Sequence, residues 1–220
     1  NKIITETNII NRNVLEIGPG YGFLTDVIIE KKPKNLFLIE KDIYLKEILN
    51  KKYIDNKKIE IIADDILTFN LSQFKNLIVI SNLPYNISTK VILYLFKFYQ
   101  NIDEMVFMLQ KEVAYKFDYN LPNMNKYKFL TNIVSTYKRC FNVSSKVFIP
   151  KPKINSTVVK FKFKKENFDL AKANYFSNII FKNVRKKIYN NIKVKTNNDL
   201  INKRVNQLSI NELLTIYDSF

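Results

Sequence analysis

Short apolar runs alternate with longer amphipathic segments over the first 110 residues of the chain. The runs predict buried strands, and they lie at residues 14–17, 36–39, 59–63, 77–80 and 105–109. Segments of helical length separate them, notably residues 23–29 and residues 89–99, the second with Ser88 or Thr89 as its N-cap. We therefore expect an α/β fold with a mostly parallel sheet and helices on both faces.

Beyond residue 126 the pattern predicts one further helix and two further strands. They lie at residues 127–137, 141–148 and 156–163, and Pro150 and Pro152 separate the two strands. The polar stretch 164–167 is a candidate boundary, and the residues after it are typical of a small helical region. We expect two domains, residues 1–165 with the sheet and residues 166–220 with helices.

All the glycines of the chain lie in one turn after the first predicted strand, at Gly18, Gly20 and Gly22. A glycine turn between a strand and a helix is how α/β folds hold a nucleotide-like ligand. Glu40 ends the second strand at the spacing where a carboxylate binds ribose hydroxyls. The third glycine comes four residues after the first rather than five, which favours an adenosine cofactor other than a dinucleotide. A tight turn followed by a surface glutamate is the structural alternative.

Four predicted strands end in groups that can bind a ligand: Gly18, Glu40, Asp65 and Asn82. Parallel strands bring their carboxyl ends to one edge of a sheet, where α/β folds bind ligands. Asp65 is expected to accept a hydrogen bond from an adenine amino group. We therefore expect one site to contain all four groups.

Composition excludes several kinds of chemistry. The 220 residues include no histidine, so a Ser-His-Asp triad and a histidine metal site are excluded, and no metal is expected. The lone Cys140 allows no internal disulfide and fits a reducing compartment. No apolar run is long enough to span a bilayer, so no membrane partner is expected. The start at Asn1 suggests a longer gene product.

Basic residues are concentrated in the second half of the chain. The net charge is +16, and residues 138–205 hold 18 Lys and Arg against three acids, whereas residues 1–137 hold 18 against 15. Such a one-sided segment attracts phosphate and is typical of nucleic-acid binding. A solvated basic face is the alternative.

The tetrapeptide Asn82-Leu83-Pro84-Tyr85 comes directly after the fourth strand and suggests a reaction. An exocyclic base amine is a poor nucleophile, and it becomes a better one when an Asn carbonyl and a backbone carbonyl held by proline accept its two N–H bonds. Tyr85 offers a face on which the base stacks. Methyl transfer from S-adenosylmethionine fits, since it requires no histidine. A plain Asn-Pro turn is the alternative.

Four segments resemble the rRNA adenine N6,N6-dimethyltransferases, in that family's order. They are Glu16-Ile17-Gly18-Pro19-Gly20, residues 82–89, Met108-Leu109-Gln110-Lys111-Glu112-Val113-Ala114 and residues 148–156, and Phe181 to Lys187 resembles that family's basic helix. The resemblance implies a Rossmann-like S-adenosylmethionine-dependent methyltransferase with a catalytic domain at 1–165 and an rRNA-binding domain at 166–220. The segment 108–113 is similar to the branch that dimethylates two adjacent adenines near the 3′ end of small-subunit rRNA.

The resemblance also implies roles for individual residues. The residues implied to be catalytic are Asn82, Pro84, Tyr85 and Phe148, with Phe148 stacking on the base opposite Tyr85. The residues implied to bind the cofactor are Gly18, Gly20, Glu40, Asp65 and Asn82. The residues implied to bind RNA are Lys151, Lys153, Arg185, Lys186 and Lys187. The family's N-terminal Gly-Gln-Asn-Phe segment, which closes over the cofactor, is not found, and Asn183-Val184-Arg185 stands where an Arg pair is usual. The first departure predicts weaker binding of the cofactor, and the second predicts weaker contacts between this basic segment and RNA.

The expected partner is the immature small ribosomal subunit, and the protein is expected to act as a monomer in ribosome biogenesis. The expected location is the bacterial cytoplasm, with an organelle left open. The other branch of the family, which dimethylates a large-subunit adenine, is an alternative. A non-catalytic ribosome-assembly or mitochondrial transcription factor and an NAD-linked oxidoreductase are two others.

Overall fold

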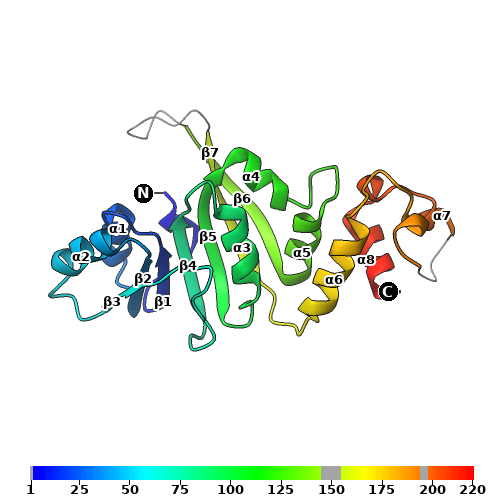
Figure 1. Cartoon of the computed structure of the whole chain (residues 1–220). Coiled ribbons are helices and arrows are strands. Elements are labelled where there is room, and N and C mark those ends of the chain that lie inside the picture. The colour runs from blue at the N-terminus through cyan, green and yellow to red at the C-terminus, as the bar shows by residue number, and fades with distance from the viewer. Residues whose placement is uncertain (1, 145–154, 194–197) are drawn as a thin grey trace. The chain divides into compact units, whose positions relative to one another are not determined.

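The computed structural model describes residues 2–144, 155–193 and 198–220 (Figure 1). Its contacts divide the chain into two compact units: Asn1–Ala114 with Lys138–Lys165, and Tyr115–Tyr137 with Glu166–Phe220. The first unit holds most of the sheet and the second is mainly helical. Residues 115–137, which the sequence pattern groups with the sheet, thus lie in the same unit as the C-terminal helices.

The described residues form a seven-stranded sheet of order β3-β2-β1-β4-β5-β7-β6. The strands are β1 Asn13–Ile17, β2 Asn35–Glu40, β3 Ile59–Ala63, β4 Leu77–Asn82, β5 Ile102–Gln110, β6 Ser135–Val143 and β7 Ser156–Phe163. The first five pair in parallel and β7 pairs antiparallel with β5. Central parallel strands are buried on both faces, which explains the continuous apolar run in β4, where Leu77 to Ile80 are all buried.

Helices cover both faces of this sheet, as the sequence predicts. The first unit contains the 3₁₀ turn η1 Ile4–Glu6 and the helices α1 Phe23–Glu30, α2 Ile43–Lys52 and α3 Ser88–Phe96. Ile28 of α1 and Ile4 share a buried cluster with Val14 and Leu36. On the opposite face, Phe96 of α3 meets Phe161 of β7 with ring centroids 5.9 Å apart, and Figure 1 shows α3 in front of the sheet.

The second unit has its own aromatic core. Its helices are α5 Lys126–Val134, α6 Leu170–Ile180, α7 Asn198–Ile201 and α8 Ile210–Asp218; α4 Lys111–Phe117 crosses the boundary between the units. Phe129 of α5 contacts Phe176 of α6 and Tyr217 of α8 at centroid distances of 5.2 and 5.4 Å. Aromatic pairs at this spacing stabilise a fold beyond the area they bury.

Several predicted boundaries were wrong. Ser88 is the first residue of α3 rather than its cap: Ile87 is the N-cap, and the Ser88 hydroxyl donates to the Tyr85 carbonyl at 3.2 Å. The helix predicted over residues 127–137 ends at Val134, because Ser135 adopts an extended conformation with φ −151° and ψ 162°. The strand β6 therefore begins at Ser135, earlier than the predicted strand 141–148, whose last residues lie outside the described part of the chain.

The basic segment Phe181 to Lys187 is not a helix, contrary to what the family resemblance implies. Helix α6 ends at Ile180, and the residues after it form turns. The backbone then pairs with a distant segment: Lys187 forms a bridge with Arg204, and the Ile188 N–H donates to the Lys203 carbonyl at 3.0 Å.

Candidate active site

The glycine turn, residues 18–22, leaves β1 and enters α1. The Gly18 N–H donates to the Ile39 carbonyl at 2.9 Å, which ties the turn to β2. Gly18 and Gly20 have φ of +62° and +58°, values that L residues rarely adopt. Apart from the residues that flank each glycine, no heavy atom of the described residues lies within 4 Å of the place where a Cβ would stand on either one. The backbone here is open to a close-approaching ligand.

Glu40 is the buried carboxylate at the end of β2, only 7% exposed. Its Oε2 accepts from the Gly20 N–H at 3.2 Å and its Oε1 from the Asp42 N–H at 3.0 Å. These bonds fix the carboxylate between the glycine turn and the start of α2. A carboxylate has about four acceptor positions, so two remain for the hydroxyls of a ribose.

Glu16 is a second buried carboxyl near the glycine turn, on β1. It is 2% exposed, and the Thr25 hydroxyl of α1 donates to its Oε2 at 2.6 Å. Burial raises the pKa of Glu16 to about 7, against the lowering effect of the Thr25 bond, while Asp26 and Glu40 add to the rise. The group is therefore poised to titrate near neutral pH.

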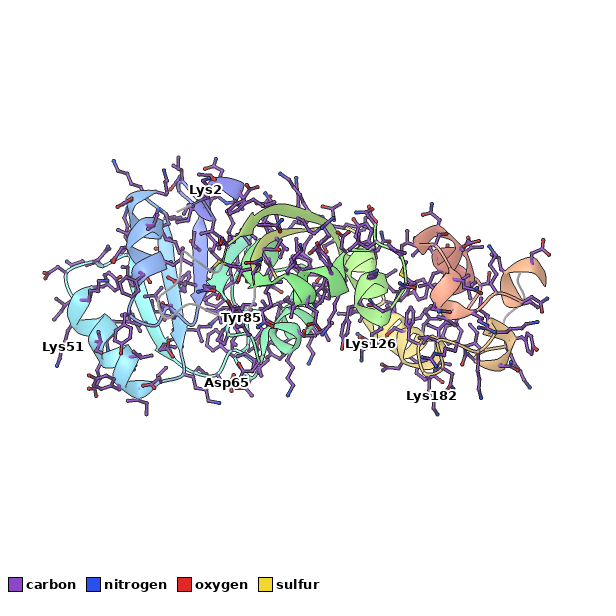
Figure 2. The ribbon with its side chains drawn as sticks, turned by 90° about the horizontal axis from the view of Figure 1, so that it is seen from above. Lys2, Lys51, Asp65, Tyr85, Lys126 and Lys182 are labelled. Carbon is purple, nitrogen blue, oxygen red and sulfur yellow. The ribbon has the colours of Figure 1, made fainter. Side chains whose placement is uncertain are left out.

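Asp65 lies just after β3 and is already engaged on both oxygens. Oδ1 accepts from the Leu67 N–H at 2.9 Å, and Oδ2 forms an ion pair with Lys41 Nζ at 2.8 Å. The hydrogen bond from Lys41 and the backbone bond from Leu67 hold the pKa of Asp65 below its usual range. Figure 2 shows the labelled Asp65 and Tyr85 side chains in the segments after β3 and β4.

The strand register brings the four strand ends to one edge. Ile17 pairs with Ile39, Glu40 pairs with Ala63, and the Ser81 hydroxyl donates to the Ile17 carbonyl at 2.5 Å. The other strand-end positions that the sequence predicts to bind a ligand, Gly18, Asp65 and Asn82, therefore lie at the same edge as Glu40. This placement was deduced from sequence alone through the rule on parallel strands.

The Asn82–Tyr85 turn connects β4 with α3 at this edge. Asn82 is exposed, and its side-chain amide makes no hydrogen bond to any residue in the described ranges. The Pro84 carbonyl accepts from the Ser88 N–H at 3.1 Å, so it is used by the first turn of α3. The Leu83 carbonyl accepts no hydrogen bond from the described residues. The Tyr85 hydroxyl lies 3.1 Å from the Ser156 hydroxyl.

A family model described as ribosomal RNA adenine dimethylase matches residues 1–220. The chain belongs to this family. A protein from Malacoplasma penetrans is 38% identical over 189 residues, covering 82% of this chain and 67% of its own length. One from Mycoplasmopsis synoviae is 34% identical over 235 positions, covering 99% and 90%. Both are named ribosomal RNA small subunit methyltransferase A.

Solved structures agree with the fold. A dimethyladenosine transferase from Plasmodium falciparum superposes with a TM-score of 0.78 at 22% identity, covering 98% of this chain and 92% of its own. The 23S rRNA methyltransferase ErmE superposes with a TM-score of 0.75 at 17% identity, covering 99% and 94%. Together with the family model, these findings make the chain a Rossmann-like, S-adenosylmethionine-dependent rRNA adenine dimethyltransferase.

The residues present in this dimethyltransferase fit the methyl donor. The open backbone at Gly18 and Gly20 leaves room beside the turn, and Glu40 keeps free acceptor positions next to it. Within the described ranges, no group of three or more Cys, Asp or Glu side chains is arranged to hold a metal ion. None of the helices in those ranges combines the length and apolar character of a membrane span.

Several expected site residues lie outside the part of the chain that the structure describes, or in its second unit. Phe148, Lys151 and Lys153 lie outside the described residues. Arg185, Lys186 and Lys187 are exposed in the second unit. Sequence reasoning missed Lys41, the partner of Asp65, and the Leu83 carbonyl. Lys41 could have been found, because it directly follows Glu40 in the sequence. The Leu83 carbonyl could not, because no pattern of side chains indicates which backbone carbonyl lacks a hydrogen bond.

Proposed function

We propose that the protein transfers two methyl groups to the N6 amine of each of two adjacent adenines near the 3′ end of small-subunit rRNA. The observation that carries this proposal is the agreement among relatives at 34–41% identity, which are named small subunit methyltransferases. The solved large-subunit enzyme, at 17% identity, supports the fold alone. The segment Met108 to Val113, which is similar to the small-subunit branch, supports the same target.

The two unpartnered acceptors of the Asn82–Tyr85 turn receive the amine. In the first transfer the adenine amine has two N–H bonds, and Asn82 Oδ1 accepts one of them. The Leu83 carbonyl accepts the other, because the Pro84 carbonyl is already bonded to Ser88. The ring of Pro84 restrains the backbone of Leu83, so this acceptor has a fixed direction. Accepting both bonds concentrates the lone pair on nitrogen and orients it. In each transfer the N–C bond forms as the S–C bond of the donor breaks, and the resulting ammonium loses one proton to water.

The bound cofactor supplies an electrophilic methyl group on a sulfonium. The chain's own residues supply its position: Glu40 binds the ribose hydroxyls, Asp65 accepts from the adenine amino group, and Gly18 and Gly20 allow close approach. Tyr85 stacks on the target adenine, with its ring direction fixed by the bond to Ser156. Phe148 stacks on the other face of that base.

The basic segment 138–205 binds the rRNA backbone. Its exposed residues include Arg185, Lys186 and Lys187, and Lys151 and Lys153 belong to the same set. Phosphate contacts of this kind position the RNA without reading its sequence. The substrate is the immature small subunit in the cytoplasm, where the protein acts as a monomer during ribosome biogenesis.

The test uses purified protein, labelled S-adenosylmethionine, and small and large subunits isolated from cells that lack this modification. Mass spectrometry of the 3′ terminal fragment is expected to show two adjacent adenines, each with two added methyl groups. Label in large-subunit rRNA would instead support the other branch. Absence of label in both subunits, with cofactor bound, would support a non-catalytic factor and overturn the proposal.

A further inference from the structure

Two consecutive carbonyl groups of the glycine turn are held from the end of α2. Lys52, the last residue of the helix, donates from Nζ to the Tyr21 carbonyl at 3.2 Å. Tyr53, its C-cap, places its hydroxyl 3.1 Å from the Gly22 carbonyl. These contacts join segments 31 positions apart in the sequence, and they are separate from the contacts of Glu40.

The same two side chains bind both oxygens of Asp26 on α1. Lys52 Nζ is 2.7 Å from Oδ2, and the Tyr53 hydroxyl is 2.7 Å from Oδ1. The glycine turn, the first turn of α1 and the end of α2 are therefore linked in one closed network. Burial and the neighbouring carboxylate raise the pKa of Tyr53, so its hydroxyl keeps its single proton, which the Asp26 carboxylate at 2.7 Å and the Gly22 carbonyl at 3.1 Å share.

The glycine turn has a packed side and an open side. A Cβ on Gly22 would lie 2.4 Å from the Tyr53 hydroxyl oxygen and 3.2 Å from its Cζ, so the Tyr53 ring fills the space behind the turn. Among the residues that the structure describes, only chain neighbours come within 4 Å of the Cβ positions of Gly18 and Gly20. The contacts of Lys52 and Tyr53 thus fix the turn without occupying the side that a ligand would use.

We propose that Tyr53 and Lys52 are positioning residues for the methyl donor: they hold the glycine turn by its carbonyl groups in the conformation that binds the cofactor. The proposal rests on the role given above to this turn. A turn with three positive-φ glycines loses much conformational entropy when it is ordered. When the hydrogen bonds of Lys52 and Tyr53 order the turn beforehand, less conformational entropy is lost as the cofactor binds. The cofactor therefore binds more tightly.

The test measures S-adenosylmethionine affinity by isothermal titration calorimetry in the absence of RNA, together with kcat and KM. Tyr53→Phe and Lys52→Met are each expected to weaken binding about 3- to 10-fold, the effect of one hydrogen bond. The KM for RNA and the kcat at saturating cofactor stay at the parent values. Lys52→Arg keeps a donor and restores most of the affinity.

Matched controls are Tyr44→Phe and Lys51→Met, which change exposed residues of the same helix and are expected to leave affinity unchanged. Thermal unfolding of each variant reports folding separately. A Tyr53→Phe protein that melts earlier but binds cofactor like the parent would reduce Tyr53 to a structural role and overturn the proposal. A parent protein that binds no S-adenosylmethionine would contradict the proposed function itself.

Discussion

The two turns at the edge of the sheet differ in how their polar groups are satisfied. The glycine turn is held from outside: its Gly20 N–H donates to Glu40 at the end of β2, and Lys52 and Tyr53 at the end of α2 contact its Tyr21 and Gly22 carbonyls. In the Asn82–Tyr85 turn, the Asn82 amide and the Leu83 carbonyl have no hydrogen-bond partner within the described ranges. Hydrogen bonds to other parts of the protein order the glycine turn, whereas the Asn82–Tyr85 turn keeps two acceptors available for a substrate.

Under the proposed function, this difference assigns cofactor binding to the glycine turn and methyl transfer to the Asn82–Tyr85 turn. An acceptor left without a partner can bond a substrate N–H without first breaking a protein bond, which favours its use in the reaction. A carboxylate already fixed by the backbone binds a ligand with little reorganisation. Variants of the glycine turn should therefore change cofactor affinity, and variants of the Asn82–Tyr85 turn should change the rate of transfer.

The largest effect is expected for Asn82→Ala. The loss of one acceptor for the amine should lower kcat by about 100- to 1,000-fold, the usual effect of removing one preorganised hydrogen bond in an active site. Cofactor affinity should change by less than about threefold, since Glu40 and the glycine turn are intact. The control is Asn86→Ala, an exposed residue of the same turn. Equal losses of rate and affinity would remove the distinction between the turns.

Glu16→Gln tests the buried carboxyl near the glycine turn. The pKa of Glu16 is about 7 in the folded protein against 4.5 for the free group. Between pH 4.5 and about 7, the Glu16 carboxyl is ionised in the unfolded chain but still protonated in the folded protein. The contribution of Glu16 to stability is therefore fully present below pH 4.5 and is lost as the pH rises to about 7. The variant, which keeps the acceptor for Thr25, should gain up to about 3 kcal/mol relative to the parent by pH 8. Urea unfolding at several pH values measures this gain; a pH-independent difference would contradict it.

Glu40→Gln tests the carboxylate at the end of β2, which backbone N–H groups fix beside the glycine turn. The amide places an NH₂ group against one of the two N–H donors and removes the charge, so cofactor affinity should fall by about 10- to 100-fold. The kcat at saturating cofactor should change far less. Glu47→Gln, an exposed acid on α2, serves as the control. Calorimetry of cofactor binding decides the outcome, and an unchanged affinity would exclude a role for Glu40 in ribose binding.

The smallest effect is expected for Lys41→Met. Lys41 and Asp65 form an exposed ion pair, and solvent screens such pairs strongly, so affinity and stability should change little. The pKa of Asp65 should rise toward its usual value, which NMR of its side-chain carboxyl measures. A large loss of cofactor affinity would show instead that Lys41 itself contacts the cofactor.

Much of the sheet, and the edge where the expected ligand-binding residues meet, could be predicted from sequence. The side chains that hold the glycine turn from α2 could not. The strand β4 is predictable because a buried parallel strand is a continuous apolar run, and Glu40 because it ends such a run. The residues 127–137 mix helix-forming and β-branched side chains, and tertiary contacts decide that Ser135 begins a strand. Tyr53 lies 31 positions from Gly22, and no local pattern reports a contact at that distance.

The double variant Glu40→Gln/Asn82→Ala tests most directly whether the two turns act separately. Cofactor affinity and the single-turnover rate at saturating cofactor are measured for the parent, both single variants and the double variant. The account predicts that the double variant has the affinity of Glu40→Gln and the rate of Asn82→Ala, with the two effects adding within about 0.5 kcal/mol. A double variant whose affinity falls well beyond that of Glu40→Gln would show that Asn82 also holds the cofactor, as the family resemblance implies, and would contradict the separation.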